Sequence, residues 1–122
     1  MTGLNNIIIK YGTTRTVFLV YKYAIKIPSC VEWRLFLLGL LANMQESIFS
    51  KTKWPELCPV IFSLPLGLCV IMERAKEISR QQFFNLDYNK FIHQNGYVVP
   101  VEHKLDSFGI LEGEIVAVDY GN

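Results

Sequence analysis

Two charged residues beside apolar segments are the first candidates for chemistry. Asp119 directly follows the apolar segment 115–118 and begins an Asp-Tyr-Gly sequence. A carboxylate at the point where a strand leaves the core can bind a cation. Lys26 belongs to an alternating segment, in which it lies on the face opposite Ile25 and Ile27. The sequence therefore presents one anion and one cation for the fold to position.

A second polar group lies before the last predicted strands, in the segment Glu-His-Lys-Leu-Asp-Ser at residues 102–107. His103 and Lys104 lie between two carboxylates, Glu102 and Asp106, and this mixture is compatible with acid–base catalysis. Mixed polar loops are also commonly solvated without any catalytic role. Both interpretations stay open at the level of sequence.

Five apolar segments have the alternation and the β-branched or aromatic content of strands. Turn-forming sequences separate several of them, and Pro28 ends the third. These features predict an antiparallel sheet with strands at residues 5–10, 16–20, 23–27, 59–63 and 68–72.

The segment between the third and fourth strands predicts one long helix that ends near residue 49. Ser29 and Glu32 have the spacing of a capping box at its start. The most apolar run, residues 35–42, is too short to cross a bilayer, so it predicts a buried helix. The apolar residues that recur at helical spacing are Leu37, Leu41, Met44 and Ile48.

The remaining chain predicts smaller elements. A polar hinge at residues 73–76 precedes one or two short helices in 79–93, and a β-hairpin follows with its turn at Glu112 and Gly113. The predicted fold class is α+β, with a five-stranded antiparallel sheet and one long helix, then short helices and a C-terminal β-hairpin. We expect a single domain, residues 1–122, with the sheet and long helix in 1–75.

Composition excludes several classes of function. Twelve basic and eleven acidic residues leave a formal net charge of +1, so no overall field attracts nucleic acid or an anionic membrane. The chain has three cysteines, with no Cys-x-x-Cys sequence, and two histidines. This set does not favour a disulfide framework or a zinc site. We expect the cysteines to be small buried side chains. The N-terminus lacks the features of a secretory peptide, so we expect a cytoplasmic protein.

The order of these features resembles the protein-kinase-like fold, including its aminoglycoside-phosphotransferase-type and phage-encoded branches. The Ala-Ile-Lys sequence ending at Lys26 is similar to the strand lysine motif, which implies that Lys26 neutralises the α- and β-phosphates of ATP. The resemblance implies Glu46 as the partner of this lysine, with Glu32 as the alternative. Asp119 is similar to the aspartate of the Asp-Phe-Gly motif, which implies that it binds Mg²⁺.

Residues 102–107 resemble the catalytic loop of the same family. In one register, Glu102 takes the position of the catalytic base and Ser107 that of the metal-binding asparagine. A register shifted by one residue places Asp106 at the asparagine position and Val101 at the base position. The resemblance leaves both registers open.

The phosphate-binding loop of the family is only partly present. Gly12 is the retained glycine that implies a phosphate contact, whereas Lys10 and Arg15 replace the other glycines. The sequence resembles a kinase truncated after the Asp-Tyr-Gly motif, in which residues 1–75 are similar to the N-lobe and residues 76–122 to a remnant of the catalytic region.

The resemblance implies a pseudokinase that is encoded by a phage or mobile element. Such a protein would bind and modulate a host protein or defence complex in the host bacterial cytoplasm, with residual binding of ATP and Mg²⁺. The alternative is a minimal ATP-dependent phosphotransferase that uses Glu102 or Asp106 as base. Neither a nucleic acid nor a membrane is expected as a partner, and the oligomeric state stays open.

Overall fold

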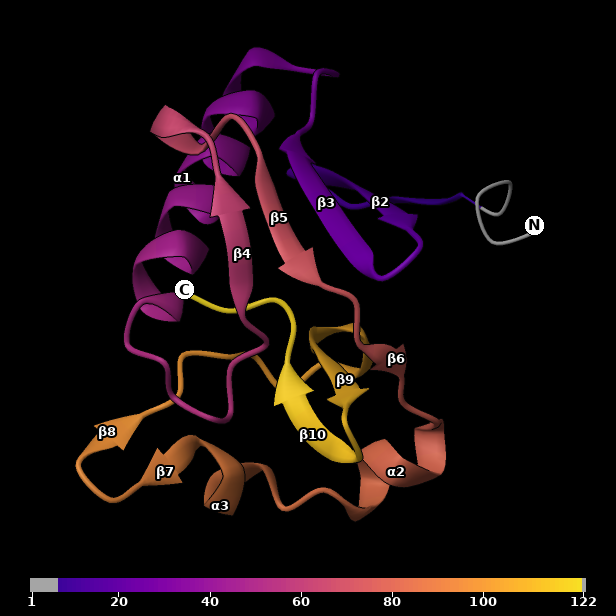
Figure 1. The fold of residues 1–122 in the computed structure, drawn as a ribbon, viewed down its shortest axis with the longest axis vertical. Helices are drawn as coiled ribbons and strands as arrows, with labels where there is room; N and C mark the ends of the chain where they lie inside the picture. Colours follow the sequence, from indigo (N-terminus) through magenta and orange to yellow (C-terminus); the bar gives the residue numbers. More distant parts are fainter. Residues whose placement is uncertain (1–6, 122) are drawn as a thin grey trace.

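A computed structural model describes residues 7–121, which form an α+β fold (Figure 1). The strands of the main sheet are antiparallel neighbours in the order β1-β2-β3-β5-β4. This confirms the predicted class and the five-stranded antiparallel sheet, although residues 5–6 of the first predicted strand lie outside the described residues. Within the described part of the chain, no helix is both long and apolar enough to cross a membrane. The strand bounds are β1 (Ile8–Tyr11), β2 (Arg15–Val20), β3 (Tyr23–Pro28), β4 (Val60–Ser63) and β5 (Val70–Glu73).

Most of the chain after β5 lies below the main sheet in Figure 1 and includes the predicted short helices and C-terminal hairpin. Glu112 and Gly113 have φ values of 53° and 83°, the left-handed conformation that a two-residue hairpin turn requires. A short strand that pairs with β9 was not predicted, because two residues show no periodicity. The elements are β6 (Lys76–Glu77), α2 (Arg80–Asn85), α3 (Tyr88–Ile92), β7 (His93–Gln94), β8 (Tyr97–Val98), η3 (Leu105–Ser107), β9 (Phe108–Leu111) and β10 (Glu114–Ala117).

The long helix α1 (Trp33–Ser50) begins later than the capping box predicted. Its N-cap is Glu32, and no side chain caps the first turn. The backbone N–H of Ser29 donates to the Thr14 carbonyl at 2.8 Å, so Ser29 belongs to the connection that leaves β3. The predicted capping box was therefore wrong, because contact with the β1–β2 turn holds this segment outside the helix.

The face of α1 that contacts the sheet is polar, and the predicted apolar face was wrong. The buried residues of the helix are Gly39, Asn43 and Glu46. A Cβ at Gly39 would collide with the backbone of Thr14 and Pro28, so only glycine permits this close approach. The apolar stripe that includes Leu41 instead faces outward. Burial of the polar face is stable only because the sheet supplies charged partners for it.

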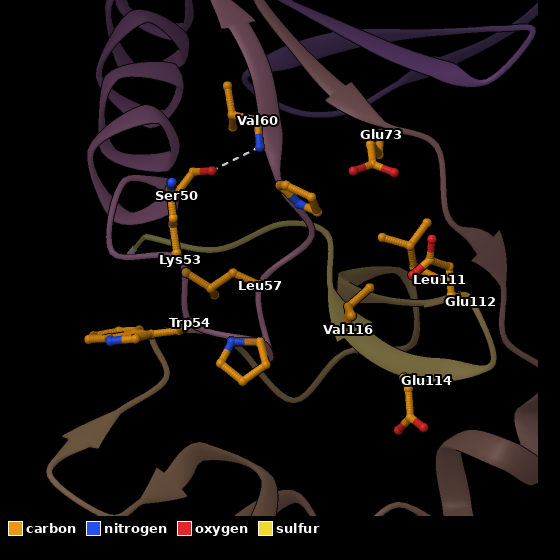
Figure 2. Close-up of a pocket in the computed structure, with 12 residues that line it drawn as sticks. Ser50, Lys53, Trp54, Leu57, Val60, Glu73, Leu111, Glu112, Glu114 and Val116 are labelled. Carbon is orange, nitrogen blue, oxygen red and sulfur yellow. Dashed lines mark hydrogen bonds between the residues drawn. The ribbon is translucent and has the colours of Figure 1, made fainter.

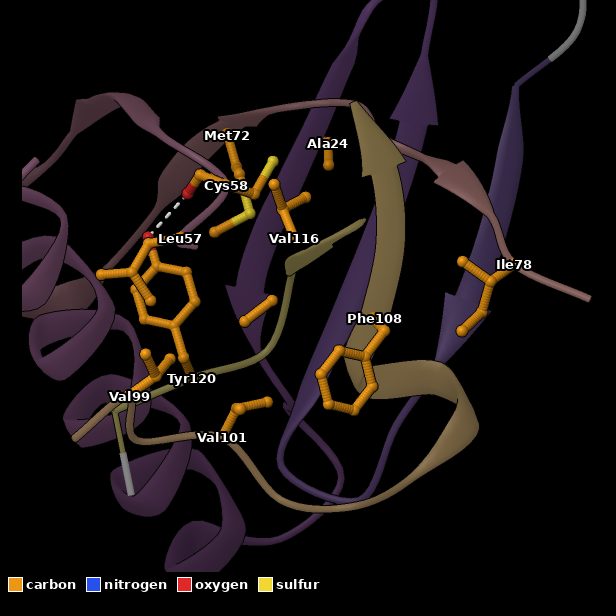
Figure 3. Close-up of a cluster of buried hydrophobic side chains, with 11 residues drawn as sticks. Ala24, Leu57, Cys58, Met72, Ile78, Val99, Val101, Phe108, Val116 and Tyr120 are labelled. Carbon is orange, nitrogen blue, oxygen red and sulfur yellow. Dashed lines mark hydrogen bonds between the residues drawn. The ribbon is translucent and has the colours of Figure 1, made fainter. Parts of the chain in front are cut away.

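The hydrophobic core lies between the main sheet and the C-terminal segment (Figure 3). Tyr120 is central to it, because its ring is buried and its hydroxyl donates to the Cys58 carbonyl at 2.7 Å. This bond ties the end of the chain to the segment before β4. The core residues are Ala24, Leu57, Cys58, Met72, Ile78, Val99, Val101, Phe108, Val116, Ala117 and Tyr120.

The three cysteines occupy different environments. Cys58 is buried in the core, and Cys69 is half-buried. Burial raises the pKa of the Cys58 thiol to about 12. Cys30 is exposed in the connection between β3 and α1, so the prediction that all three are buried was wrong for this residue.

The short helix η2 (Pro65–Gly67) contacts α1 through Gly67. This glycine has a φ of +75°, and a Cβ there would collide with the Leu40 carbonyl. We therefore expect Gly67→Ala to lower the free energy of unfolding in urea by about 1–3 kcal/mol. The matched control is Gly113→Ala, because Gly113 has a φ of +83° but open space around it. Equal losses in the two variants would contradict a role for close contact between η2 and α1.

Candidate functional site

Charged side chains from four separate segments meet where α1, the main sheet and the C-terminal segment come together. Alternation along β3 places Lys26 on the buried face, with Ala24 and Pro28. Glu46 comes from the buried face of α1, and Asp119 follows β10. The fourth is Arg15, the first residue of β2. We call these four residues, Arg15, Lys26, Glu46 and Asp119, the charge cluster.

Lys26 and Glu46 form a buried ion pair. The Nζ of Lys26 donates to both carboxylate oxygens of Glu46, at 3.0 and 3.1 Å, and also to the carbonyl of Val118. An ammonium has three protons to donate, so all of its donors are used within the protein. Glu32, the alternative partner, lies instead 3.8 Å from Nε of Arg34 at the surface.

Arg15 joins the other members of the charge cluster. Its two terminal nitrogens donate to the two oxygens of Glu46 at 2.7 and 2.9 Å. The same nitrogens donate to Oδ1 of Asn43 at 2.9 Å and to Oδ1 of Asp119 at 2.7 Å. Such a forked contact is specific to the planar guanidinium group. Arg15 thereby connects β2 to α1 and to the segment after β10.

The sequence prediction treated Arg15 only as a replacement for a loop glycine and missed this role. A signal for it exists in the alternation of β2. Val17 pairs with Lys26 in the sheet, and residues two apart in a strand lie on the same face. Arg15 therefore shares the face of Lys26, although alternation alone does not reveal its partner.

Asn43, also missed by the prediction, fixes α1 against its neighbours. Its Nδ2 donates to the carbonyls of Lys26 at 3.2 Å and Gly67 at 2.9 Å. Its Oδ1 accepts from Arg15. The backbone N–H of Tyr120 adds a further bond to Glu46, at 3.2 Å. Among the described residues, every buried side-chain nitrogen and oxygen has a partner, so the site is a closed hydrogen-bond network.

The electrostatics of the charge cluster follow from its uneven burial. Burial alone would raise the pKa of Glu46, but the charges and hydrogen bonds of Lys26 and Arg15 outweigh burial and hold this pKa below its ordinary value. Burial lowers the pKa of Lys26, and repulsion from Arg15 adds to that effect. Asp119 is the second anion of the charge cluster, and it lies at the edge of the cluster, where its side chain is 51% exposed. Glu46 is therefore the anion on which two buried cations depend.

The other predicted site residues lie outside this network. Gly12 is exposed, and its N–H donates within the β1–β2 turn to the Arg15 carbonyl at 2.8 Å. Glu102 is exposed and pairs with Lys104 at 3.0 Å. Asp106 is exposed in η3. Within the described residues, neither of these carboxylates bonds to the charge cluster.

Ser107 differs from its neighbours in the segment 102–107 because it is buried. Its backbone carbonyl accepts from the N–H of Val118 at 2.8 Å. This bond places the end of η3 beside the residue that precedes Asp119. The contact is made by the backbone, so it does not depend on the Ser107 hydroxyl.

The charge cluster, as arranged, does not fit a nucleotide with Mg²⁺. One oxygen of Asp119 already accepts from Arg15, and a guanidinium beside a carboxylate opposes binding of a metal cation there. Lys26 has no donor left for a phosphate oxygen. Residues 7–121 contain no group of three or more His, Cys, Asp or Glu side chains that could hold a metal ion.

A surface cavity of about 480 Å³ lies apart from the charge cluster (Figure 2). Trp54, Leu57 and Val116 provide apolar walls between the end of α1 and the β9–β10 hairpin. The carboxylates at this cavity belong to Glu73, Glu112 and Glu114. No member of the charge cluster lines it.

Comparisons of the chain with protein-family models, with curated proteins and with solved structures found no match. A function therefore has to be argued from the residues themselves. The two features that carry such an argument are the closed charge cluster and the exposed apolar surface of α1.

Proposed function

We propose that this protein is a kinase-like binding module without phosphotransferase activity, which attaches to another protein and modulates it. The kinase-like character comes from the order of the sequence motifs around Lys26, Glu46 and Asp119. The observation that carries the proposal is the position of Arg15, whose guanidinium bonds to both Glu46 and Asp119. In the setting that the resemblance implies, a phage or mobile element encodes the module and a host protein or defence complex is its target.

The energetics of the charge cluster support a role without catalysis. Phosphoryl transfer depends on a lysine and Mg²⁺ that neutralise the phosphates. Here the donors of Lys26 and one oxygen of Asp119 are engaged within the protein. Opening a buried ion pair by withdrawing one partner costs about 3–5 kcal/mol. A nucleotide would have to supply that free energy before it gained any contact.

The same network supports a structural role. It joins β2, β3, α1 and the segment after β10 at one point. A frame held in this way can present a fixed surface to a partner. The chain also exposes large apolar side chains on α1 and β4, and such surface is typical of protein-binding sites.

A minimal phosphotransferase is the second candidate. The direct ion pair between Lys26 and Glu46 favours it, since this pair is required in active kinases. In that case Glu102 or Asp106 would serve as base, and Arg15 would have to leave Asp119 when the nucleotide binds. The two candidates therefore differ in what Mg²⁺ and ATP do to the protein.

We expect millimolar ATP with Mg²⁺ to leave the melting temperature of the wild-type protein unchanged, because the network leaves no site for it. Thermal unfolding with and without nucleotide measures this. Incubation with radiolabelled ATP and a host lysate should likewise give no labelling beyond that of Asp119→Asn. This variant keeps the shape of the side chain and removes its charge. A magnesium-dependent rise in melting temperature that Asp119→Asn abolishes, or labelling lost in that variant, would favour the phosphotransferase.

A further inference from the structure

The outward face of α1 carries a stripe of apolar side chains with the spacing of a coiled coil. Leu37, Leu41, Met44 and Ile48 follow one another at intervals of four, three and four residues. Leu41 is 46% exposed and Ile48 is 61% exposed. In Figure 1, α1 lies at the left edge of the molecule with β4 and β5 on its other side. We call these four residues the outer seam.

The outer seam has no exposed charge along its length. Between Trp33 and the end of α1, the charged residues are Arg34, in the first turn, and Glu46, which is fully buried. A helix on the surface of a protein normally turns its apolar stripe inward and its charged residues outward. Here that arrangement is reversed, since the buried face belongs to the charge cluster. The outer seam is therefore a surface without a partner among residues 7–121.

Neighbouring elements extend this apolar surface. Gly67 of η2 lies directly against Leu40 of α1. Leu66 beside it is 72% exposed. Leu64 and Leu68, on either side of η2, are also exposed. Exposed apolar residues on elements that contact one another mark an interaction site more often than scattered exposed residues do.

The spacing of the outer seam indicates the shape of its partner. Alternating intervals of three and four residues let side chains enter the holes between side chains of a facing helix. The seam spans twelve residues, 37–48, whose eleven helical steps correspond to a length of about 17 Å. An α-helix of about three turns with its own uncharged apolar stripe would cover it.

The charges at the two ends of the outer seam indicate the charge of the partner. Arg34 lies at the N-terminal end, with its side chain 80% exposed. Lys51 and Lys53, both exposed, lie beyond the C-terminal end. The acidic residue nearby, Glu32, lies beside Arg34 at 3.8 Å. A partner helix with acidic residues at both ends of its stripe would therefore be complementary.

A second copy of this chain fits less well. In an antiparallel pair of α1 helices, Arg34 of one copy would face Lys51 of the other. In a parallel pair, each of these residues would face itself. Both arrangements place Arg34 and Lys51 against like charges, which opposes association.

We infer that the outer seam of α1 is the docking site for an amphipathic helix of another protein, with an apolar heptad stripe and acidic residues at both ends. The inference deepens the proposed function and rests on it, since it names the kind of partner that the module binds. The docked helix would lie along α1, on the side away from the main sheet. The charge cluster on the opposite face would hold α1 in place for it.

The test uses a synthetic helical peptide about three heptads long, with apolar a and d positions and glutamate at the flanking positions. Fluorescence anisotropy of the labelled peptide should show binding to the wild-type protein. Leu41→Gln should weaken this binding by about tenfold or more, because it removes a central apolar contact. The matched control is Phe84→Gln in α2, since Phe84 is 81% exposed but lies outside the seam. This variant should bind as the wild type does.

A second peptide with lysine in place of glutamate should bind about tenfold more weakly at low salt. Circular dichroism should show that both protein variants remain folded. Absence of binding, equal binding by the two variants, or preference for the lysine peptide would overturn the inference. A wild-type dimer that Leu41→Gln dissociates, seen by sedimentation, would assign the seam to a second copy instead. None of these outcomes depends on nucleotide, so they are separable from the test of the proposed function.

Discussion

Replacement of Glu46 by alanine should lower the free energy of unfolding by about 3–5 kcal/mol. Glu46 is fully buried, and it is the anion shared by Lys26 and Arg15. Its removal leaves two buried cations with the half-exposed Asp119 as their nearest carboxylate, and it removes the acceptor for the Tyr120 N–H. Unfolding in urea, followed by circular dichroism, measures the change.

One further variant separates the charge of Glu46 from its other contributions, and a second provides a control at the surface. Glu46→Gln keeps the size of the side chain and removes the charge, so it should also be strongly destabilised. Glu112→Ala, at an exposed hairpin turn, should change the free energy by no more than about 0.5 kcal/mol. A loss for Glu46→Ala as small as that for Glu112→Ala would show that the charge cluster does not stabilise the fold.

The same variants should differ in their response to acid. The pKa of Glu46 is lower in the folded protein than its ordinary value of 4.5. The stability that its charge contributes is therefore present above that value and is lost as the pH falls through the folded-state pKa. Unfolding measured at a series of pH values should show this loss for the wild type and not for Glu46→Gln. An identical pH dependence of the two proteins would contradict the assignment.

Replacement of Arg15 by alanine should have the second large effect, a loss of about 3 kcal/mol in the free energy of unfolding. The variant leaves Lys26 as the sole cation beside Glu46 and removes the bonds to Asn43 and Asp119. Arg15→Lys should recover only part of this loss, because a single ammonium cannot reach all of these acceptors as a planar fork does. Urea unfolding of the three proteins measures the order of stability.

Asp119→Ala provides the comparison for Arg15. Its carboxylate also bonds to Arg15, but its side chain is 51% exposed, so solvent screens the interaction. Its loss should cost less than about 1 kcal/mol. If Asp119→Ala lowered the free energy of unfolding as much as Arg15→Ala does, the exposed contact with Asp119, and not the buried contacts, would account for the stability that Arg15 contributes. Equal stability of Arg15→Lys and the wild type would show that a single positive charge is sufficient.

Local patterns were sufficient for most of the larger elements of this fold. Alternation predicted β3 and the position of Lys26 on the face opposite Ile25 and Ile27, since a strand places successive side chains on opposite faces. The hairpin turn at Glu112 and Gly113 follows from the need of such turns for residues that accept a positive φ. Both properties depend on neighbours in the sequence, so the sequence alone reveals them.

The orientation of α1 could not be predicted in the same way. Its leucine stripe and its Gly39, Asn43 and Glu46 face both have helical spacing, and apolar periodicity favours burial of the leucines. The main sheet determines the orientation of the helix instead. Its strands carry Arg15 and Lys26, whose buried charges require partners. The helix therefore turns its polar face inward and leaves the apolar one for solvent or for a partner.

The sequence by itself determined the α+β class, the antiparallel strands, the long helix and the motifs that include Lys26, Glu46 and Asp119. Only the tertiary structure determined that Arg15 bonds to Glu46 and Asp119 and so links these residues in one network. Arg15 lies 31 residues before Glu46 and 104 residues before Asp119. Contacts over such separations arise from the packing of whole elements, and the pattern around any one residue does not contain them.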